Sequence, residues 1–342
     1  MKIAIDISQI VYETGVSVYT RNLVQNLLKN DRENEYILYG GSLRQFNSLK
    51  LITNRFLGKY TCKLYPIPPT LADIIWNKVH IFTIEKLIGN IDVFHSSDWT
   101  QPPSKALKIT TIHDLIPLLF PKLSDPRIIK VHKKRLYWII NEVDWVIVPS
   151  QTTAMDAVKL GIDKHRIKVI PEAPDSIFKP ELKEKIERIK KKYKIFGKYL
   201  LAVGVNPRKN YERIISAYEK IRAGLDLKMI FVGSNSFNIE QKRGVIFTGN
   251  IPYDELPSFY SGAEALIYPS LYEGFGLPIL EAFSCKTPVL TSSYGSMKEI
   301  AGEYAVLVDP YSIDSISNGI VNILKNRDRY VNAGTKRIKD YS

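Results

Sequence analysis

Cysteine is scarce in this sequence, and long apolar runs are absent from it. Cys62 and Cys285 are the only two cysteines in 342 residues, and no CxxC pair or Cys/His cluster occurs. This excludes a disulfide scaffold, argues against a structural zinc site and indicates a reducing compartment. Because no apolar run reaches about 18 residues, no transmembrane helix is predicted.

The first residues, MKIAIDIS, do not have the pattern of a signal peptide. Their apolar part is short and contains Asp6, so the segment predicts a first β-strand instead. We therefore expect a cytoplasmic protein, and peripheral contact with the inner face of a membrane stays open.

Length and charge narrow the class of protein. A chain of 342 residues suits two domains of about 150 residues each, and 45% hydrophobic with 24% charged residues is ordinary for a globular protein. The net charge of +13 favours partners that carry phosphate, such as nucleic acid, lipid headgroups or phosphorylated substrates. Charge alone leaves all three open.

Short β-rich runs alternate with helical patterns along the chain. The predicted strands are 2–7, 36–40, 92–96, 108–114 and 145–150, then 199–204, 227–233, 245–249, 264–270 and 287–293. Helical patterns include 17–30, 210–224 and 314–326. Such alternation predicts an α/β protein with parallel sheets and helices on both faces.

The strand pattern restarts near residue 199, after a hydrophilic stretch. Residues 181–198 contain eight basic and three acidic side chains, which favours a solvated surface helix over a membrane or polyanion contact. We therefore expect an N-terminal domain at 1–175, a linker at 176–195 and a C-terminal domain at 196–342.

The segment VNPRKN follows a predicted strand and precedes a helix that begins near Tyr211. It places Arg208 and Lys209 beside a helix N-terminus, and ligands of doubly wound folds bind at the carboxyl ends of the strands. Two cations at such a place suit a phosphate. An exposed basic turn is an equally good interpretation of this segment alone.

The segment EGFGLPILEA holds Glu273 and Glu281, with two glycines and a proline between them. Gly274 and Gly276 let the backbone approach a ligand closely, and Pro278 suits the first turn of a helix. We expect Glu281 in that first turn, where carboxylates can accept hydrogen bonds from paired sugar hydroxyls. An ordinary helix cap is the alternative.

With these residues in view, the chain resembles the retaining GT-B glycosyltransferases of family 4, also described as group 1, and their mannosyltransferase-like members in particular. The segment at 273–282 is similar to their E-x7-E motif. VNPRKN, GNIPYDEL, TTIHDLIPL, WVIVPSQTTAMDAV and RIKVIPEAPD resemble further family segments, and the resemblance covers nearly the whole chain. It implies two Rossmann-like doubly wound domains that face each other across a cleft.

The resemblance also implies roles for single residues. Arg208 and Lys209 match the positions that hold the diphosphate of a nucleotide sugar, and Glu281 matches the one that contacts the ribose. Glu273 and His113 match residues near the donor sugar. Further contacts with the nucleotide sugar are expected from Gly15, Gly204, Asn206, Gly233, Asn250, Ile251, Gly274, Phe275, Gly276 and Leu277.

The activity implied is retaining transfer of a hexosyl group without a metal or another cofactor. No Asp-x-Asp triplet occurs, and Arg208 with Lys209 can stabilise a leaving diphosphate electrostatically. The IHDLIPL and PRKN segments favour GDP-mannose as donor, and UDP- and dTDP-sugars stay open. The acceptor implied is a glycan or a lipid-linked glycan, and no nucleic-acid partner is expected.

Several alternatives remain at this point. The chain could be a sugar-nucleotide epimerase of the same fold, or an inactive relative that binds polyanions; a dehydrogenase is disfavoured because no GxGxxG follows the first strand. His95 and Asp98, together with Asp114, are candidate acceptor contacts. The helix expected at 125–140 carries a basic stripe with aromatics, which favours a solvated face over a membrane face.

Overall fold

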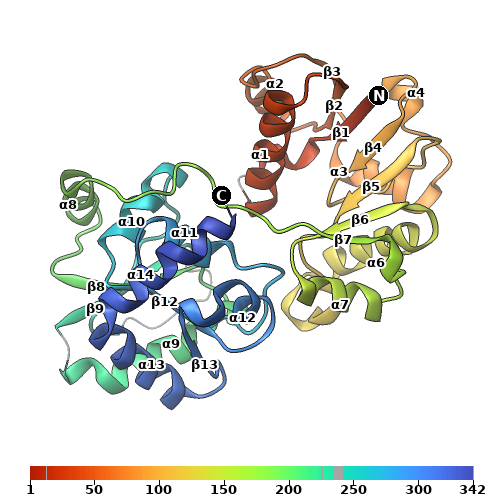
Figure 1. Cartoon of the computed structure of the whole chain (residues 1–342). Coiled ribbons are helices and arrows are strands. Elements are labelled where there is room, and N and C mark those ends of the chain that lie inside the picture. The colour runs from red at the N-terminus through yellow and green to blue at the C-terminus, as the bar shows by residue number, and fades with distance from the viewer. Residues whose placement is uncertain (13, 225, 235–241, 342) are drawn as a thin grey trace. The chain divides into compact units, whose positions relative to one another are not determined.

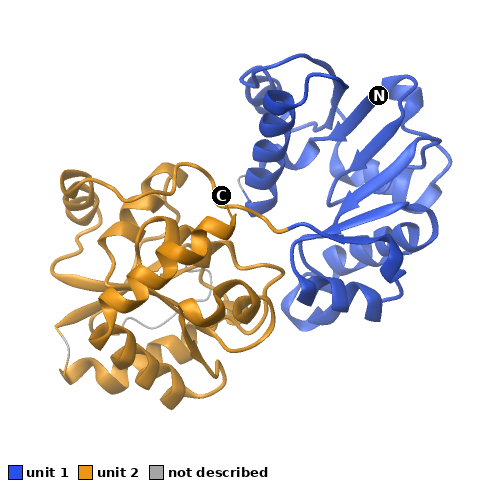
Figure 2. Cartoon of the chain, viewed as in Figure 1, with its two compact units in different colours: residues 1–170 blue, residues 171–342 orange. Residues whose placement is uncertain are grey.

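Figure 1 shows a computed structural model of the chain, in which residues 1–12, 14–224, 226–234 and 242–341 are described. The contacts divide the chain into two compact units, unit 1 at Met1–Ile170 and unit 2 at Pro171–Ser342 (Figure 2). Each unit is an α/β domain with a parallel sheet, which confirms the predicted fold class.

Among the described residues, unit 1 contains a seven-stranded sheet with the order β3-β2-β1-β4-β5-β6-β7, and every neighbouring pair is parallel. The strands are β1 (Lys2–Asp6), β2 (Glu35–Gly41), β3 (Tyr60–Tyr65), β4 (Val93–Ser96), β5 (Leu107–Thr111), β6 (Trp145–Val148) and β7 (Ile167–Val169). Strands β1 to β3 extend the sheet towards one edge, and strands β4 to β7 extend it towards the other. The carboxyl ends of β1 and β4 therefore flank the switch point, where doubly wound folds bind ligands.

Helices cover both faces of this sheet, and Figure 1 shows α1 and α2 near β1 to β3. They are α1 (Gly15–Asn30), α2 (Phe46–Thr53), α3 (Pro69–Ala72), α4 (Glu85–Ile88), α5 (Ile116–Leu119), α6 (Pro126–Glu142) and α7 (Gln151–Lys159). Helix α1 is capped at its start by Thr14, whose side chain accepts a hydrogen bond from the backbone N–H of Ser17. Val24 and Leu28 on α1 pack against Ile5 of β1, which fixes this helix on the sheet.

Unit 2 contains, within its described residues, a six-stranded parallel sheet with the order β10-β9-β8-β11-β12-β13. The strands are β8 (Lys198–Val203), β9 (Leu227–Val232), β10 (Val245–Phe247), β11 (Ala265–Tyr268), β12 (Val289–Ser292) and β13 (Val306–Val308). Along β8, Tyr199 and Leu201 enter one core cluster while Leu200 and Ala202 enter another, so the sheet is buried on both faces. The switch point here lies between β8 and β11.

The helices of unit 2 include the stretch that the sequence assigned to a linker. They are α8 (Lys183–Lys192), α9 (Tyr211–Ile221), α10 (Leu256–Gly262), α11 (Leu277–Ser284), α12 (Gly295–Ala301), α13 (Ile313–Lys325) and α14 (Arg327–Arg337). Ile189 of α8 and Ile195 after it are buried in the core of unit 2, so residues 176–195 belong to that unit in the contact-based division.

Candidate functional site

Two cations and a carboxylate meet at the switch point of unit 2. Arg208 and Lys209 lie on a single 3-10 turn (Pro207–Lys209) that begins four residues after the end of β8, and Glu273 lies in the loop after β11. The Glu273 carboxylate pairs with the Arg208 guanidinium and lies 2.6 Å from the Lys209 ammonium nitrogen. The hydroxyl of Tyr268, the last residue of β11, donates a hydrogen bond of 2.9 Å to the same carboxylate.

The backbone after β8 is shaped to hold these cations. Asn206 accepts a 3.0 Å hydrogen bond from the backbone N–H of Lys209 through its side chain. Asn210 takes a left-handed conformation (φ 65°), and its amide donates to the backbone oxygens of Pro269 and Pro310. Gly204 has φ 84°, and a Cβ there would lie 3.2 Å from Cε of Lys209. This glycine therefore lets the lysine side chain pack back over the end of its own strand.

Burial and neighbouring charges shift the pKa values of this cluster in opposite directions. Burial alone would raise the pKa of Glu273, but Lys209 and Arg208 outweigh it and hold the pKa at about 2. Burial lowers the pKa of Lys209, and Glu273 opposes that shift. With one carboxylate against two cations, the cluster carries a net positive charge where little water reaches, and an anion would be attracted to it.

The glycine-rich loop leads from this cluster into α11. Gly276 has φ 112° and directly precedes the helix, which begins at Leu277. Phe275 is buried in the core of unit 2, and Ser296 donates a 2.7 Å hydrogen bond to the backbone oxygen of Glu273. The loop is therefore anchored at Glu273 and at Phe275, on either side of Gly274.

Glu281 lies in the second turn of α11, not in the first as the sequence predicted, because the helix already begins at Leu277 and Glu281 is its fifth residue. Its carboxylate accepts a 2.6 Å hydrogen bond from the Tyr260 hydroxyl of α10. Burial raises the pKa of Glu281 to about 7, against the hydrogen bond from Tyr260 and the charge of Lys209, both of which lower it. The group is therefore close to its ionisation midpoint at neutral pH.

The other predicted residues of unit 2 lie at neighbouring strand ends. Gly233 follows β9 with φ 131°, and a Cβ there would lie 3.4 Å from Cα of Gly204. Its N–H donates a 3.1 Å hydrogen bond to the oxygen of Gly249, which follows β10. Next to it, Asn250 is exposed and Ile251 packs partly against the core. The carboxyl ends of β8, β9 and β10 are thus held close together by contacts among the backbones of Gly204, Gly233 and Gly249.

The remaining two predicted residues, His113 and Gly15, lie in unit 1. His113 follows β5, and its ring meets the Tyr19 ring edge-on at 4.5 Å between centroids. It shares a small hollow with Asp6 of β1 and His95 of β4, so it lies at the switch point of its own sheet. Gly15 is the exposed first residue of α1, and a Cβ there would meet nothing within 4 Å.

A larger cavity of about 530 Å³ opens at the same edge of the unit 1 sheet. Its walls are largely aromatic and apolar, and its polar lining includes Asp98 and His132. Within the described part of unit 1, three of its buried polar atoms have no hydrogen-bond partner, namely the Tyr39 hydroxyl, the Trp99 ring N–H and the Gln9 side-chain oxygen. Unsatisfied buried polar groups of this kind suit a polar ligand.

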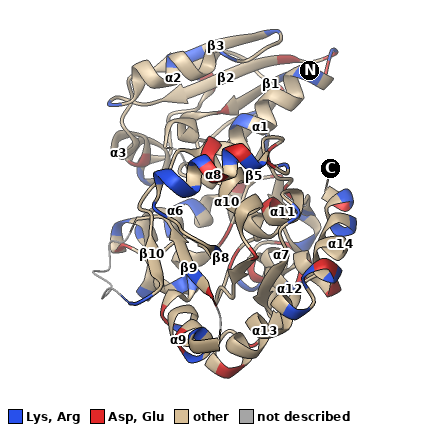
Figure 3. Ribbon diagram, turned by 90° about the vertical axis from the view of Figure 1, so that its left-hand side faces the viewer, with Lys and Arg blue, Asp and Glu red and all other residues tan. Residues whose placement is uncertain are grey.

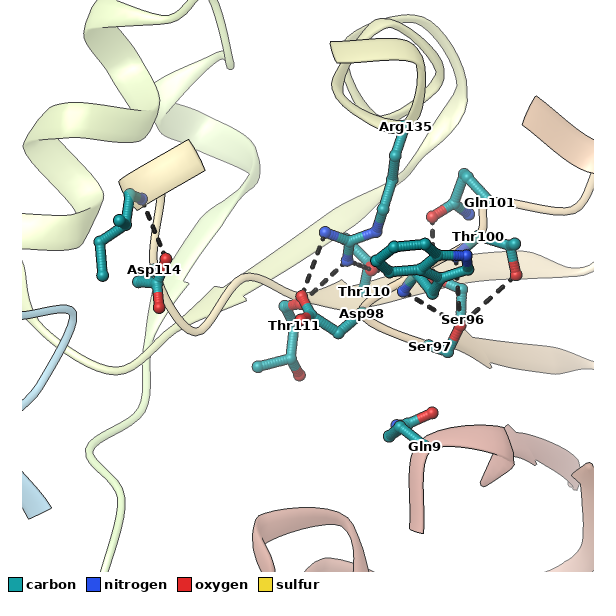
Figure 4. Close-up of polar contacts among 12 residues, drawn as sticks. Gln9, Ser96, Ser97, Asp98, Thr100, Gln101, Thr110, Thr111, Asp114 and Arg135 are labelled. Carbon is teal, nitrogen blue, oxygen red and sulfur yellow. Dashed lines mark hydrogen bonds and ion pairs between the residues drawn. The ribbon is translucent and has the colours of Figure 1, made fainter. Parts of the chain in front are cut away.

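Behind this cavity lies the buried guanidinium of Arg135 on α6, which Figure 4 shows among its partners. It donates to the Thr110 hydroxyl at 2.8 Å and to the Thr111 backbone oxygen at 3.0 Å, and pairs with Asp98 at 3.4 Å. Asp98 is therefore oriented from behind by a fixed cation. Asp114 instead accepts a 2.9 Å hydrogen bond from the N–H of Ile116 at the start of α5.

Sequence reasoning missed several residues that complete both sites. Tyr268 and Tyr260 each donate to one of the two glutamates, and Arg135 orients Asp98. The only signal for Tyr268 was its position near the end of the strand predicted at 264–270. Nothing in the sequence connected Tyr260 with Glu281 or Arg135 with Asp98, because helix packing brings each pair together.

Two parallel sheets with helices on both faces, one in each unit, are the arrangement of the GT-B fold. Residues 182–340 match the family model "Glycosyl transferases group 1", and residues 14–175 match the model "Glycosyltransferase Family 4". The two matches together span nearly the whole chain. It therefore belongs to glycosyltransferase family 4, as the motifs predicted.

Curated relatives have modest identity to this chain. "O-antigen chain mannosyltransferase B" of Escherichia coli is 26% identical over 249 residues, which are 68% of this chain and 65% of that protein. "O-antigen chain mannosyltransferase RfbU" of Salmonella typhimurium is 30% identical over 225 residues, 62% of this chain and 60% of that protein. The "Serotype-specific mannosyltransferase WbdA" of Escherichia coli is 29% identical, and the match spans 28% of its length. The chain thus spans less than two thirds of these relatives.

Solved structures share the fold over the full chain. Sucrose-phosphate synthase from Thermosynechococcus elongatus has a TM-score of 0.72 at 18% identity, covering 100% of this chain and 94% of that one. HepE of Anabaena, in complex with UDP and glucose, has a TM-score of 0.72 at 16% identity, covering 100% and 95%. At such identities the likeness concerns the fold alone.

Proposed function

We propose that this chain transfers a hexosyl group from a nucleotide sugar to a glycan or lipid-linked acceptor, with retention of anomeric configuration and without a metal. The observation that carries this proposal is the pair of cations, Arg208 and Lys209, held on Glu273 at the switch point of unit 2. A net positive cluster at the end of a parallel sheet suits the diphosphate of a nucleotide sugar.

Breaking the bond between sugar and phosphate leaves negative charge on the departing nucleoside diphosphate. Arg208 and Lys209 stabilise that charge, and because their positions are fixed before the reaction, little reorganisation is needed when the charge develops. This supports transfer without a metal. The chain offers no residue that we assign as a covalent nucleophile, and we propose that the departing phosphate assists deprotonation of the acceptor on the same face.

The two glutamates take different roles in this proposal. An ionised carboxylate offers about four lone-pair positions. Arg208, Lys209 and Tyr268 occupy three of them on Glu273, which leaves one for a hydroxyl of the donor sugar. Glu281 has one partner, Tyr260, and can accept from a ribose hydroxyl. Backbone at 274–277 contacts sugar and phosphate, and Asn250 with Ile251 lines the base pocket.

Unit 1 supplies the acceptor site and His113, which approaches the donor sugar. The aromatic walls of the 530 Å³ cavity and the unsatisfied groups of Tyr39, Trp99 and Gln9 support a polar acceptor with apolar faces, such as a sugar ring. Arg135 holds Asp98 in place as a hydrogen-bond acceptor for an incoming hydroxyl. We place this reaction in the cytoplasm, at the inner face of the membrane.

GDP-mannose is the donor we favour, because several curated relatives carry the name mannosyltransferase. The UDP complex of HepE makes UDP-sugars the first alternative. Calorimetric titration with GDP, UDP and dTDP tests the donor class directly, and the same titrations of Lys209→Ala form the control. One nucleotide should bind tightly to the wild type and weakly to the variant.

Binding that survives Lys209→Ala unchanged would refute the site assignment, and equal binding of all three nucleotides would refute selection of the donor by its base. A transfer assay with GDP-mannose and a mannose-containing oligosaccharide, run with and without EDTA, tests the chemistry. Activity should persist in EDTA, and NMR of the product should show the anomeric configuration of the donor.

A further inference from the structure

The 530 Å³ cavity of unit 1 offers no cation to a ligand. Among the described residues that line it, none is a lysine or an arginine, and Asp98 is the single acid. His132 lines it too, but burial lowers the pKa of this histidine, which keeps its ring neutral at neutral pH. The charge on the cavity wall is therefore that of the Asp98 carboxylate.

This lack of cations contrasts with the rest of the chain, whose net charge is +13. In the part that the structure describes, no helix is long and apolar enough to cross a membrane, and Figure 3 shows Lys and Arg on helices of both units, α6 and α8 among them. A hollow of about 520 Å³ elsewhere on unit 1 is lined by four lysines, and one of about 330 Å³ on unit 2 by two lysines and an arginine. The acceptor cavity thus differs in charge from both of these hollows.

The guanidinium of Arg135 does not change this conclusion. Arg135 is not among the residues that line the cavity, and its side chain is only 4% exposed. Its N–H groups point to Thr110, Thr111 and Asp98 (Figure 4). A ligand in the cavity therefore meets the Asp98 carboxylate, which stands in front of the buried cation.

The polar atoms at the cavity that have no partner are all neutral. The Trp99 ring N–H is a donor, the Gln9 side-chain oxygen is an acceptor, and the Tyr39 hydroxyl can be either. Such a mixture complements sugar hydroxyls, each of which can donate and accept. It cannot compensate the full negative charge of a carboxylate or a phosphate.

We propose that this cavity selects a neutral sugar as the acceptor unit and rejects acidic or phosphorylated sugars. An anionic group brought into the cavity would lose its water, find no cation on the wall and lie near the Asp98 carboxylate. The word acceptor rests on the proposed function, whereas the neutrality of the ligand rests on the cavity alone.

The same selection would keep the donor out of the acceptor cavity. The diphosphate of a nucleotide sugar suits Arg208 and Lys209 of unit 2, and it finds no such pair on the cavity wall of unit 1. The two substrates are then sorted by charge. An excess of donor should therefore not compete with the acceptor for its site.

The test measures binding to the full chain without nucleotide. Trp76 and Trp99 line the cavity, so tryptophan fluorescence reports its occupation. The probes are the methyl glycosides of mannose, glucose and galactose and the matching methyl uronides, in which a carboxylate replaces the C6 hydroxymethyl group. At least one neutral glycoside should bind, and its uronide should bind about tenfold more weakly or worse, because its charge stays uncompensated.

Two variants add the same positive charge at different places. Ile128 lines the cavity and is exposed, so Ile128→Lys puts a cation at the wall, and the uronide should then bind at least as tightly as the neutral glycoside. Damage to the fold cannot produce such a gain. Leu123→Lys is the matched control, because Leu123 is exposed as well but does not line the cavity. It should discriminate against the uronide as the wild type does.

Several results would overturn the proposal. A uronide that binds the wild type as tightly as its neutral glycoside would show that the cavity does not select by charge. No gain in uronide binding by Ile128→Lys, or an equal gain in Leu123→Lys, would exclude the cavity wall as the cause. Binding of no neutral glycoside would show that the cavity is not a sugar site. The nucleotide titrations of Lys209→Ala probe unit 2, so failure of the proposed function would appear separately.

Discussion

Replacing Glu273 by Gln should destabilise unit 2 and leave unit 1 unaffected. The change keeps the side-chain shape and removes the charge that Arg208 and Lys209 share. Removing one partner of a buried ion pair costs about 3 to 5 kcal/mol. A second route gives a similar figure, because the pKa of Glu273 falls from 4.5 to about 2 in the folded chain, a difference worth about 3 kcal/mol.

The pH dependence of this effect has a definite sign. A carboxyl whose pKa is lowered by folding contributes its stability above the unfolded value of 4.5 and loses it as the pH falls towards about 2. The difference between wild type and Glu273→Gln should therefore be full at neutral pH and shrink in acid. Urea unfolding at pH 7 and at pH 3 measures it.

The chain provides an internal control for this measurement. All four tryptophans, Trp76, Trp99, Trp138 and Trp145, lie in unit 1. Tryptophan fluorescence therefore follows the unfolding of unit 1, while far-UV circular dichroism follows both units. In Glu273→Gln, the dichroism transition of unit 2 should shift to lower urea while the fluorescence transition stays in place.

An added anion should restore part of the stability that unit 2 loses in Glu273→Gln, if that loss is electrostatic. Inorganic diphosphate can neutralise Arg208 and Lys209 in place of the missing carboxylate, so it should raise the midpoint of Glu273→Gln more than that of the wild type. An unchanged unit 2 transition in the variant, or a fluorescence transition that shifts equally, would refute the reasoning.

Three further predictions concern the surroundings of this cluster. Glu281→Gln should remove a pH dependence of nucleotide binding that strengthens in the wild type between pH 6 and 8, as a group with a pKa of about 7 ionises. The raised pKa also means that stability is lost as the pH rises from 4.5 to about 7, so this variant should be up to about 3 kcal/mol more stable than the wild type at pH 8. Gly204→Ala should cost about 1 to 2 kcal/mol in urea unfolding, because φ is 84° there, and should weaken nucleotide binding by pushing on Lys209. Tyr260→Phe removes a hydrogen bond that lowers the pKa of Glu281, so the pH midpoint of nucleotide binding should move upward, and a midpoint that stays in place would contradict the role given to Tyr260.

Most of the fold could be predicted from the sequence. The ten predicted strands all overlap strands of the structure, because buried parallel strands are apolar β-rich runs that stand out from their flanks. Among the strands of the described residues, the three that escaped prediction, β3, β7 and β13, are all edge strands. An edge strand is paired on one side only; β7 has three residues, and β3 exposes Thr61 and Cys62, so the apolar signal is weak in both.

The candidate site was predictable in outline because its motif residues follow two predicted strands, which the structure places side by side in the sheet as β8 and β11. Strand ends of a parallel sheet meet at one edge, which predicts that Arg208, Lys209 and Glu273 lie on the same edge, and the pairing of β8 with β11 brings them into contact. The raised pKa of Glu281 and its hydrogen bond to Tyr260 were not predictable, because both depend on how α10 packs against α11. Their roles in catalysis remain predictions for the experiments above.

The ion pairs between Glu273 and the two cations affect how quickly a bound nucleoside diphosphate can leave the site. Because the carboxylate is held in the neighbouring loop, after β11, it acts as a permanent internal competitor for the cations that we propose to hold the diphosphate. Each departing nucleoside diphosphate would be exchanged for a counter-ion already in place, so the cations need not be exposed without a partner. Strong attraction for the leaving group is then compatible with release of the product, because the carboxylate offsets part of the cost of leaving the two cations without an anion.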